Sequence, residues 1–435
     1  MQDPRLIIAR SPMGRAQIIA IALAFLLNAL DGFDILSISF AAPGIASEWG
    51  IDRGALGVVL SMELLGMSIG SILIGHLADR KGRRPIVLGC LVLMVAGMFL
   101  AATAQSVLQL SVYRLITGLG IGGMLAATNA ITAEFSNFKR RHLTVALMAC
   151  GYPVGAAAGG LVASQLLVAN DWRSVFMFGG VATLIVLPLV WYRLPETISF
   201  LVTRRPPNAL EKVNATLRRL QHPPIDVLPP QVTDTQSLAA TRLFAPELAT
   251  TVLLFTLAYF MHLITFYFIM KWTPKIIVDM GFAASAAGRV LVWSNIGGVA
   301  GSLLFSFLTQ VVRIRPLLIV TMFLSTAFVW LFGNSPGDLS RLATIAAIAG
   351  FCTNAVIVGL YAMLAQSLPA AVRASGTGFV IGIGRGGAVI SPIAAGFLFS
   401  AGWSLGDVAT IMAAGSLVGA VAVLVLKFDL EREAA

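Results

Sequence analysis

The feature that most constrains this chain is a series of long apolar segments that runs from near its start to its end. A helix needs roughly 20 mostly apolar residues to cross a hydrocarbon core of about 30 Å, because it rises only about 1.5 Å per residue. Only 11% of the residues are charged, whereas soluble domains carry about 25%. The composition therefore predicts an all-α integral membrane protein. We expect about twelve transmembrane helices, at residues 16–40, 54–78, 86–104, 108–134, 143–168, 174–192, 248–270, 285–309, 316–333, 341–366, 375–400 and 406–427.

Lysine and arginine are distributed unevenly between the polar segments, and cytoplasmic loops of membrane proteins carry the excess. They concentrate before the first span, after the second and fourth spans, and in the long middle segment. We therefore expect both termini to be cytoplasmic and attribute the net charge of +10 to membrane topology rather than to nucleic-acid binding. The first apolar segment is too long for a signal peptide and contains Asp31 and Asp34, so we interpret it as an uncleaved span.

A polar stretch at 193–247, with three Pro-Pro pairs, divides six spans from six. We expect an N-terminal six-helix bundle at 1–192, a central cytoplasmic loop, and a C-terminal six-helix bundle at 248–435. Within the loop, Asn208 followed three residues later by Glu211 predicts a short helix capped by the asparagine side chain.

The two halves repeat at a shift of 231 residues. The shift superimposes Pro43 on Pro274, Gly50 on Gly281, Gly57 on Gly288, Gly66 on Gly297, Gly70-Ser71 on Gly301-Ser302, and Pro85 on Pro316. Glycine and proline at fixed spacing mark helix ends and close helix contacts. A parallel repeat of six plus six helices is how many secondary transporters are built, with the substrate site between the halves near the midplane.

The most specific motif follows the second span and reads GHLADRKGRR. Its marker residues are Gly75, Asp79, Arg80, Gly82, Arg83 and Arg84. This segment resembles the signature of the major facilitator superfamily, which implies a membrane carrier of two pseudo-symmetric halves. We expect the first glycine to permit a tight helix exit, the aspartate to cap a helix of the other half, and the arginines to pair across the cytoplasmic gate. The alternative is an ordinary positively charged cytoplasmic loop.

Asp31 and Asp34 lie three residues apart in the first span and share roughly one helix face. A carboxylate at mid-membrane costs about 2.5–3.5 kcal/mol on insertion scales, so two in one helix need a function. We expect them to load and release protons, and we expect Arg114 in the fourth span to pair with one of them. The alternatives are a permanent ion pair for the aspartates and a helix-end anchor for the arginine.

The pattern Asp31-Gly-Phe-Asp34 is similar to that of the aromatic acid:proton symporter family. Gly382-Ile-Gly-Arg-Gly-Gly-Ala388 with Pro392, and Leu194-Pro-Glu196, also resemble this group. The resemblance implies uptake of benzoate-like or hydroxybenzoate-like anions, driven by protons, across the bacterial inner membrane. In the fifth span Ala156 replaces a proline typical of drug–proton antiporters, which favours symport.

The substrate anion needs a cation inside the membrane, and Arg385 offers a planar guanidinium that matches a carboxylate. The alternative for this arginine is a structural ion pair. His262, which the shift superimposes on Asp31, either bonds to the substrate or is a satisfied buried histidine. An aromatic and hydrogen-bonding pocket could add Phe33, Tyr267, Trp293, Asn295 and Tyr361. Glu63 has no predicted role, and Glu134 is expected to pair with Lys139 or Arg140.

Other function classes are less consistent with the sequence. The three cysteines lie in apolar stretches without metal-ligand spacing, and no Walker-type phosphate loop is present. We expect no enzyme activity, no cofactor and no metal, and a chain able to work as a monomer in the bilayer. The alternatives left open are a proton-coupled carrier of a non-aromatic organic acid or sugar-like metabolite, and a non-transporting sensor on a carrier fold.

Overall fold

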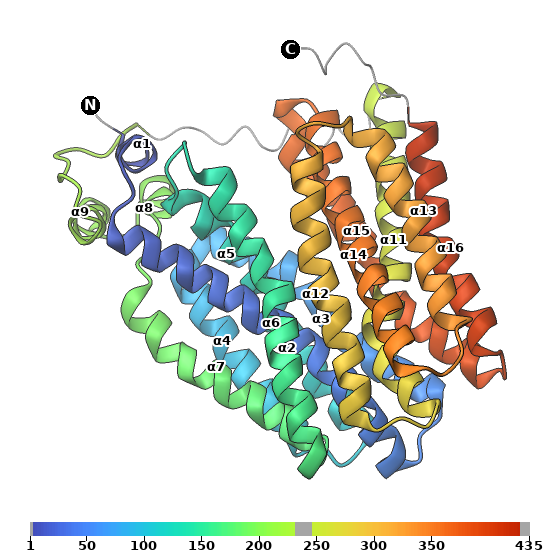
Figure 1. The fold of residues 1–435 in the computed structure, drawn as a ribbon. Helices are drawn as coiled ribbons and strands as arrows, with labels where there is room; N and C mark the ends of the chain where they lie inside the picture. The colour runs from blue at the N-terminus through green and yellow to red at the C-terminus, as the bar shows by residue number, and fades with distance from the viewer. Residues whose placement is uncertain (1–2, 231–245, 427–435) are drawn as a thin grey trace. The chain divides into compact units, whose positions relative to one another are not determined.

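A computed structural model describes residues 3–230 and 246–426, apart from the side chains of residues 79, 142, 246, 247, 370, 371 and 373–375. The helices are α1 (Pro4–Arg10), α2 (Arg15–Trp49), α3 (Arg53–Lys81), α4 (Arg83–Ala102), α5 (Val107–Phe135), α6 (Arg141–Ala169), α7 (Arg173–Arg193), α8 (Ile198–Arg204), α9 (Ala209–Arg219), α11 (Pro246–Asp279), α12 (Ala284–Leu308), α13 (Ile314–Gly333), α14 (Leu339–Ser367), α15 (Ala370–Ser400) and α16 (Leu405–Val425) (Figure 1). Twelve of them are long and apolar enough to cross a membrane, which confirms the predicted fold class.

The first spans of the two halves are longer than predicted. Both α2 and α11 continue about nine residues beyond the expected ends, through Pro43 and Pro274 respectively. A proline inside a membrane helix is tolerated where neighbouring groups satisfy the freed carbonyl. Each helix ends one or two residues before a glycine with positive φ, Gly50 at 59° and Gly281 at 95°. Two pairs related by the 231-residue shift therefore have the same structural role.

The chain divides into two compact units: unit 1 comprises the described parts of 1–38 and 62–233, and unit 2 those of 39–61 and 234–435. In unit 1, α3 packs so closely on α5 that a side chain at Gly66 would collide with the backbone of Leu115. In unit 2 a side chain at Gly297 would collide with Ala347, where α12 packs on α14. The repeat is therefore visible in the helix contacts as well as in the sequence.

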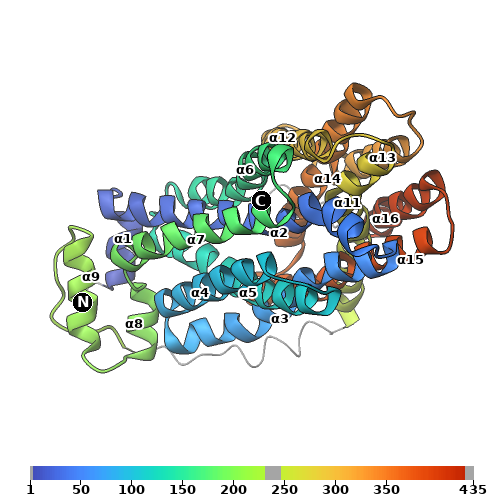
Figure 2. The ribbon, with the colours of Figure 1, turned by 90° about the horizontal axis from the view of Figure 1, so that it is seen from below.

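Glycine also sets the approach of the first and fifth spans of each half. In unit 1, Gly155 of α6 lies against the backbone of Ala29 in α2. In unit 2, Gly387 of α15 lies against the backbone of Phe260 in α11. Helix α11 packs against both α15 and α16 (Figure 2). Small residues at such crossings let membrane helices make close van der Waals contact.

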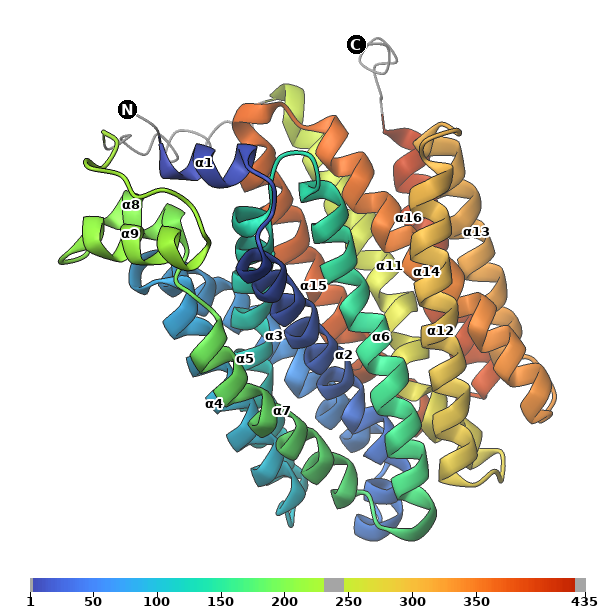
Figure 3. The ribbon, with the colours of Figure 1, turned by 60° about the vertical axis from the view of Figure 1, so that its left-hand side comes forward.

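The short helices gather at one end of unit 1, where α8 contacts both α1 and α9 (Figure 3). The predicted helix after Asn208 is present as α9, but the predicted cap is wrong. Asn208 has left-handed backbone angles (φ 59°), and its side chain makes no capping hydrogen bond. An N-cap side chain reaches the first turn from extended backbone angles, so this conformation turns the amide away.

Candidate functional site

The carboxyl groups of Asp31 and Asp34 are buried in unit 1, with the two residues 2% and 0% exposed. Within the described part of the chain, none of their four oxygens has a hydrogen-bond partner. Gly32 between them lies against the backbone of Tyr152 in α6. The close approach of α6 therefore encloses this part of α2. Two carboxyl groups without hydrogen bonds in a buried setting are suited to exchange protons rather than to hold the fold together.

Arg114 of α5 is fully buried and forms an ion pair with Glu63 of α3. The expected pairing with a carboxylate of Asp31 or Asp34 is therefore wrong in its partner. The reason is a helix crossing: Gly118, one turn along α5, lies against the backbone of Glu63 and so brings α3 to the arginine. Glu63, which had no predicted role, is the counterion.

The two terminal nitrogens of the Arg114 guanidinium make further contacts. Nη2 donates to the backbone carbonyl of Asp34 at 2.7 Å, and Nη1 lies 3.1 Å from the sulfur of Met98. The guanidinium carbon is 5.3 Å from the centre of the Phe176 ring. These contacts exclude the alternative in which this arginine reaches outward as a helix-end anchor.

Electrostatic interactions connect the group further. Asp31 interacts with Asp34 and Glu63, and Asp34 interacts with Arg114 as well. Glu63 and Asp34 thus share one guanidinium, and Asp31 interacts with both of these carboxyl groups. The gain or loss of a proton at either aspartate changes the charge balance around the arginine, which is what a proton-coupling site requires.

Phe33 is a packing residue rather than part of a pocket, contrary to the prediction. It is 3% exposed, and its ring meets Phe178 of α7 edge to face with centroids 5.2 Å apart. A side chain at Gly159 of α6 would collide with this ring. A side chain at Gly179 of α7 would come into tight contact with it. The ring therefore fills the space between α2, α6 and α7.

Arg385 of α15 is positioned by the glycines around it. Gly384 lies against the ring of Tyr259, and Gly387 lies against the backbone of Phe260, so α15 approaches α11 closely on this side. Arg385 interacts electrostatically with Tyr259. The arginine is half-buried, and no ion pair or hydrogen bond to it is found within the described residues. Its guanidinium is thus available to an anion.

Tyr259, which interacts with Arg385, is paired with a second tyrosine. The hydroxyls of Tyr259 and Tyr361 are 2.7 Å apart, and their ring centroids are 5.6 Å apart. Tyr361 was predicted, whereas Tyr259 was missed although the 231-residue shift places it opposite the polar Asn28. Tyr267 interacts electrostatically with Tyr259, and its ring packs edge to face on Phe266 with centroids 5.0 Å apart.

His262 is a satisfied buried histidine, the second of its two predicted roles. It is 0% exposed, its Nδ1 lies 2.8 Å from the hydroxyl of Ser416, and its Nε2 lies 3.0 Å from the carbonyl of Thr353. Both ring nitrogens are therefore engaged within unit 2. A ligand would have to break one of these bonds to reach the ring.

Asn295 and Trp293 do not join the tyrosine pair in a common pocket. The Asn295 amide is 1% exposed and donates to the carbonyl of Leu291 in its own helix, α12. The neighbouring Ser294 faces α14 at Gly350, whereas Trp293 is 52% exposed on a different side of α12. Successive helix positions point about 100° apart, so these neighbours cannot all face one cavity.

The motif at residues 75–84 spans the end of α3 and the start of α4. Gly75 lies inside α3 rather than at a helix exit, since α3 continues to Lys81. Gly82 has φ 103°, a conformation that glycine adopts readily, and it makes the break between the two helices. Arg80 is exposed, and the side chain of Asp79 lies outside the described residues.

The two remaining arginines of the motif bond to residues of unit 1. Arg83 pairs with Glu134 at 2.7 Å, so the expected pairing of Glu134 with Lys139 or Arg140 is wrong. Glu196 had no predicted role of its own. Its carboxylate accepts hydrogen bonds from the backbone amides of Arg83 and Arg84 at 3.0 and 3.3 Å. It thereby caps the N-terminus of α4, where a negative charge is favoured. Burial raises the pKa of Glu196, while these backbone hydrogen bonds act toward the charged form.

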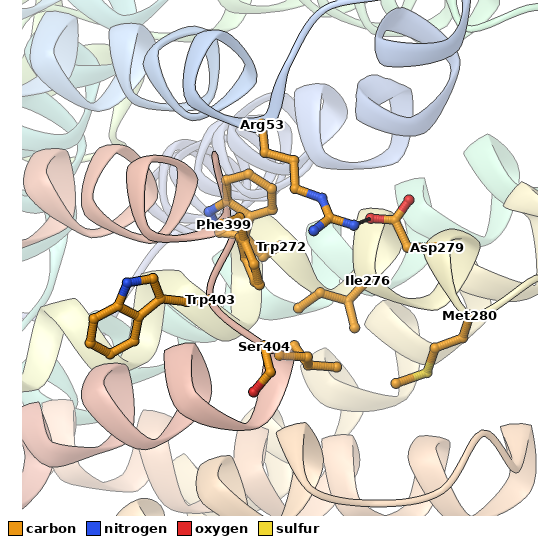
Figure 4. Close-up of a pocket in the computed structure, with 9 residues that line it drawn as sticks. Arg53, Trp272, Ile276, Asp279, Met280, Phe399, Trp403 and Ser404 are labelled. Carbon is orange, nitrogen blue, oxygen red and sulfur yellow. Dashed lines mark hydrogen bonds and ion pairs between the residues drawn. The ribbon is translucent and has the colours of Figure 1, made fainter. Parts of the chain in front are cut away.

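A depression of about 260 Å³ lies elsewhere in unit 2 (Figure 4). Its walls include Trp272, Phe399 and Trp403. Arg53 lies over the Phe399 ring at 5.2 Å and donates to Asp279 at 2.9 Å (Figure 4). Because this arginine already has a carboxylate partner, the depression is a weaker anion site than the surroundings of Arg385.

Comparisons with known proteins give the family. Residues 24–288, more than half of the 435, match the family described as Major Facilitator Superfamily. The 4-hydroxybenzoate transporter PcaK of Pseudomonas putida is 32% identical over 431 residues, with 97% of this chain and 95% of the relative covered. The 3-(3-hydroxy-phenyl)propionate transporter of Escherichia coli (strain K12) is 32% identical over 422 residues, with 94% and 93% covered.

Among solved structures, the inward open xylose transporter XylE from E. coli aligns with a TM-score of 0.76 at 16% identity, over 95% of this chain and 98% of that one. At that identity the likeness establishes the fold alone. The family match and the two relatives together establish that this chain belongs to the major facilitator superfamily of membrane transporters.

Proposed function

We propose that the protein is a proton-coupled symporter that imports a small organic anion, specifically an aromatic carboxylate of the benzoate or hydroxybenzoate type. The observation that carries the proposal is Arg385, a half-buried guanidinium without a carboxylate partner in the described residues, beside the Tyr259–Tyr361 pair. The two relatives are named for aromatic acids, which supports the same substrate class here.

The chemistry of this place suits such a substrate. A guanidinium can bind a carboxylate through two parallel hydrogen bonds. The tyrosine rings offer faces and edges to an aromatic ring, and their hydroxyls can exchange their mutual hydrogen bond for one to a substrate hydroxyl. We assign the first role to Arg385 and the second to Tyr259, Tyr361 and Tyr267.

The proton site in this proposal is the acidic group of unit 1. A charged Asp34 competes with Glu63 for the guanidinium of Arg114, and a protonated Asp34 leaves Arg114 to Glu63 alone. Proton binding at Asp31 or Asp34 therefore changes what holds α2, α3 and α5 together. A helix arrangement that responds to protonation is what alternating access by coupled transport requires.

The same proposal includes the predicted organisation. We assign 1–192 and 248–435 to two six-helix halves and 193–247 to a central cytoplasmic loop. We place both termini on the cytoplasmic side of a bacterial inner membrane, following the distribution of lysine and arginine. The substrate path lies within one chain, so a monomer suffices.

The test is uptake of labelled 4-hydroxybenzoate into proteoliposomes with an inward proton gradient. We expect accumulation that a protonophore abolishes and that benzoate, protocatechuate and vanillate compete, whereas a non-aromatic acid does not. Competition by the non-aromatic acid would indicate that the transported substrate belongs to another class of organic anion. Ligand binding without any accumulation would favour a sensor.

Two variants test the assigned residues. Arg385→Gln should raise the apparent KM at least tenfold, because a hydrogen bond to a charged group contributes about 1.5–3 kcal/mol. Arg289→Gln removes the same charge from an exposed position of α12 and should leave the KM within twofold.

Asp34→Asn should abolish accumulation against a gradient while exchange of labelled for unlabelled substrate continues. Normal gradient-driven accumulation by this variant would show that Asp34 does not take part in proton coupling.

A further inference from the structure

Three arginines from different parts of unit 1 gather at the end of α7. Arg84 at the start of α4 donates from Nη2 to the carbonyl of Trp191 at 2.7 Å. Arg219 at the end of α9 donates from Nη2 to the carbonyl of Tyr192 at 2.5 Å. Arg193 is the next residue and the last of α7. We call these three residues the arginine cluster.

The arginine cluster has no counterion among the residues that the structure describes. None of its members forms an ion pair there, and the nearby Glu196 is engaged with the backbone amides of Arg83 and Arg84. Burial lowers the pKa of Arg219, and the positive charges of Arg84 and Arg193 lower it further. Arginine stays protonated in proteins, so three positive charges repel one another here.

The cluster ends a long apolar surface. The outward face of α7 exposes Met177, Val181, Leu184, Ile185 and Leu189, each more than two-fifths accessible. At the end of this face Trp191 and Tyr192 are 54% and 72% exposed. In a membrane-spanning helix an exposed apolar face contacts acyl chains, and tryptophan and tyrosine mark the level of the lipid headgroups. The cluster therefore lies at headgroup level beside a lipid-contacting helix.

We infer that the arginine cluster binds the phosphate of an anionic phospholipid whose acyl chains lie along the exposed face of α7. Guanidinium groups match phosphate oxygens in geometry and charge. Basic pockets between membrane helices at this level are suited to anionic headgroups. A soluble phosphate would satisfy the cations but not cover the apolar face, whereas a phospholipid does both.

The consequence is structural and does not depend on the transported substrate. The cluster joins α4, α7 and α9, and it includes Arg84, the last residue of the motif at residues 75–84. An anionic headgroup offsets the repulsion among the three arginines. It thereby holds α9 against the end of the spanning bundle.

The test uses the full-length protein in a neutral detergent, titrated with dioleoyl phosphatidylglycerol or dioleoyl phosphatidylcholine in mixed micelles. Bound lipid is counted by native mass spectrometry, and thermal unfolding is followed in parallel. The wild-type protein should bind phosphatidylglycerol in preference to phosphatidylcholine and unfold at a higher temperature with it. The double variant Arg193→Gln/Arg219→Gln should lose about 30-fold in phosphatidylglycerol affinity, since each basic residue contributes about a factor of five at an anionic surface.

The matched control is Arg218→Gln, which removes the same charge from an exposed neighbouring position of α9. It should retain the wild-type affinity within twofold. Arg193→Gln alone should lose about fivefold in phosphatidylglycerol affinity. Because the Arg193 side chain makes no described hydrogen bond, this single variant tests the cluster even if the double variant misfolds. Equal affinity for the two lipids would overturn the inference. An equal loss in Arg218→Gln would do so too, as would the same stabilisation by soluble glycerol 3-phosphate.

Discussion

The ion pair between Arg114 and Glu63 offers the sharpest energetic test of the structure. Both side chains are 0% exposed, and the arginine also bonds to the Asp34 carbonyl. Removing one member of a buried pair costs about 3–5 kcal/mol, because it leaves an uncompensated charge in the interior. Arg114→Gln takes the ion-pair partner at 0% exposure away from Glu63 and the favourable interaction with the guanidinium away from Asp34. We therefore expect a loss at the upper end of that range, or a fall in Tm on the order of 10 °C.

The partner variant should behave differently. In Glu63→Gln the guanidinium keeps the Asp34 carbonyl and still interacts with the Asp34 carboxyl group. We expect a loss of only about 1–2 kcal/mol. In the double variant Arg114→Gln/Glu63→Gln one buried charge fewer is left unpaired than in Arg114→Gln. It should therefore be more stable than Arg114→Gln, with a coupling free energy of roughly 2 kcal/mol.

The assay is thermal unfolding of the four purified proteins in one detergent, with Arg289→Gln as the exposed-charge control. A double-mutant cycle isolates the interaction of the two side chains from the effect of each substitution. Strictly additive losses, with a coupling below about 0.5 kcal/mol, would refute the reasoning. Such a result would mean that Arg114 is stabilised by other groups and that Glu63 is not its counterion.

Three further variants test the packing and the assignments. Gly387→Val should lower Tm by several degrees and abolish uptake because its side chain would meet the backbone of Phe260, whereas Gly382→Ala, in open space on the same helix, should change neither in an unfolding and uptake assay. Glu196→Gln should destabilise by about 1–2 kcal/mol in thermal unfolding, since the cap of α4 loses its charge. His262→Leu should lower Tm through the loss of two hydrogen bonds, yet leave the KM for 4-hydroxybenzoate within twofold. A tenfold rise in that KM would indicate that the histidine contacts the substrate.

The spanning helices were predictable because their signal is local. An apolar run of the required length is sufficient evidence of a span, whatever it packs against. The repeat was also predictable from the sequence, because Gly66 and Gly297 occupy equivalent positions in the two halves and each allows a close helix crossing. The ends of α2 and α11 were less predictable, since a proline is a weak stop signal inside a membrane bundle.

The partners of the charged residues were not predictable in the same way. The sequence by itself determined that Arg114 and the carboxyl groups had to lie within the membrane and find compensation there. Which carboxylate pairs with Arg114 depends on the crossing of α3 and α5 at Gly118, and which pairs with Arg83 depends on how α4 meets the end of α5. Likewise, only the tertiary structure decided that His262 is satisfied and that Tyr259 joins Tyr361. The hydrophobic effect depends on the amount of apolar surface, which can be read from the sequence. Hydrogen bonds and ion pairs form only between groups a few ångströms apart, and the rotation and approach of packed helices determine which groups come that close.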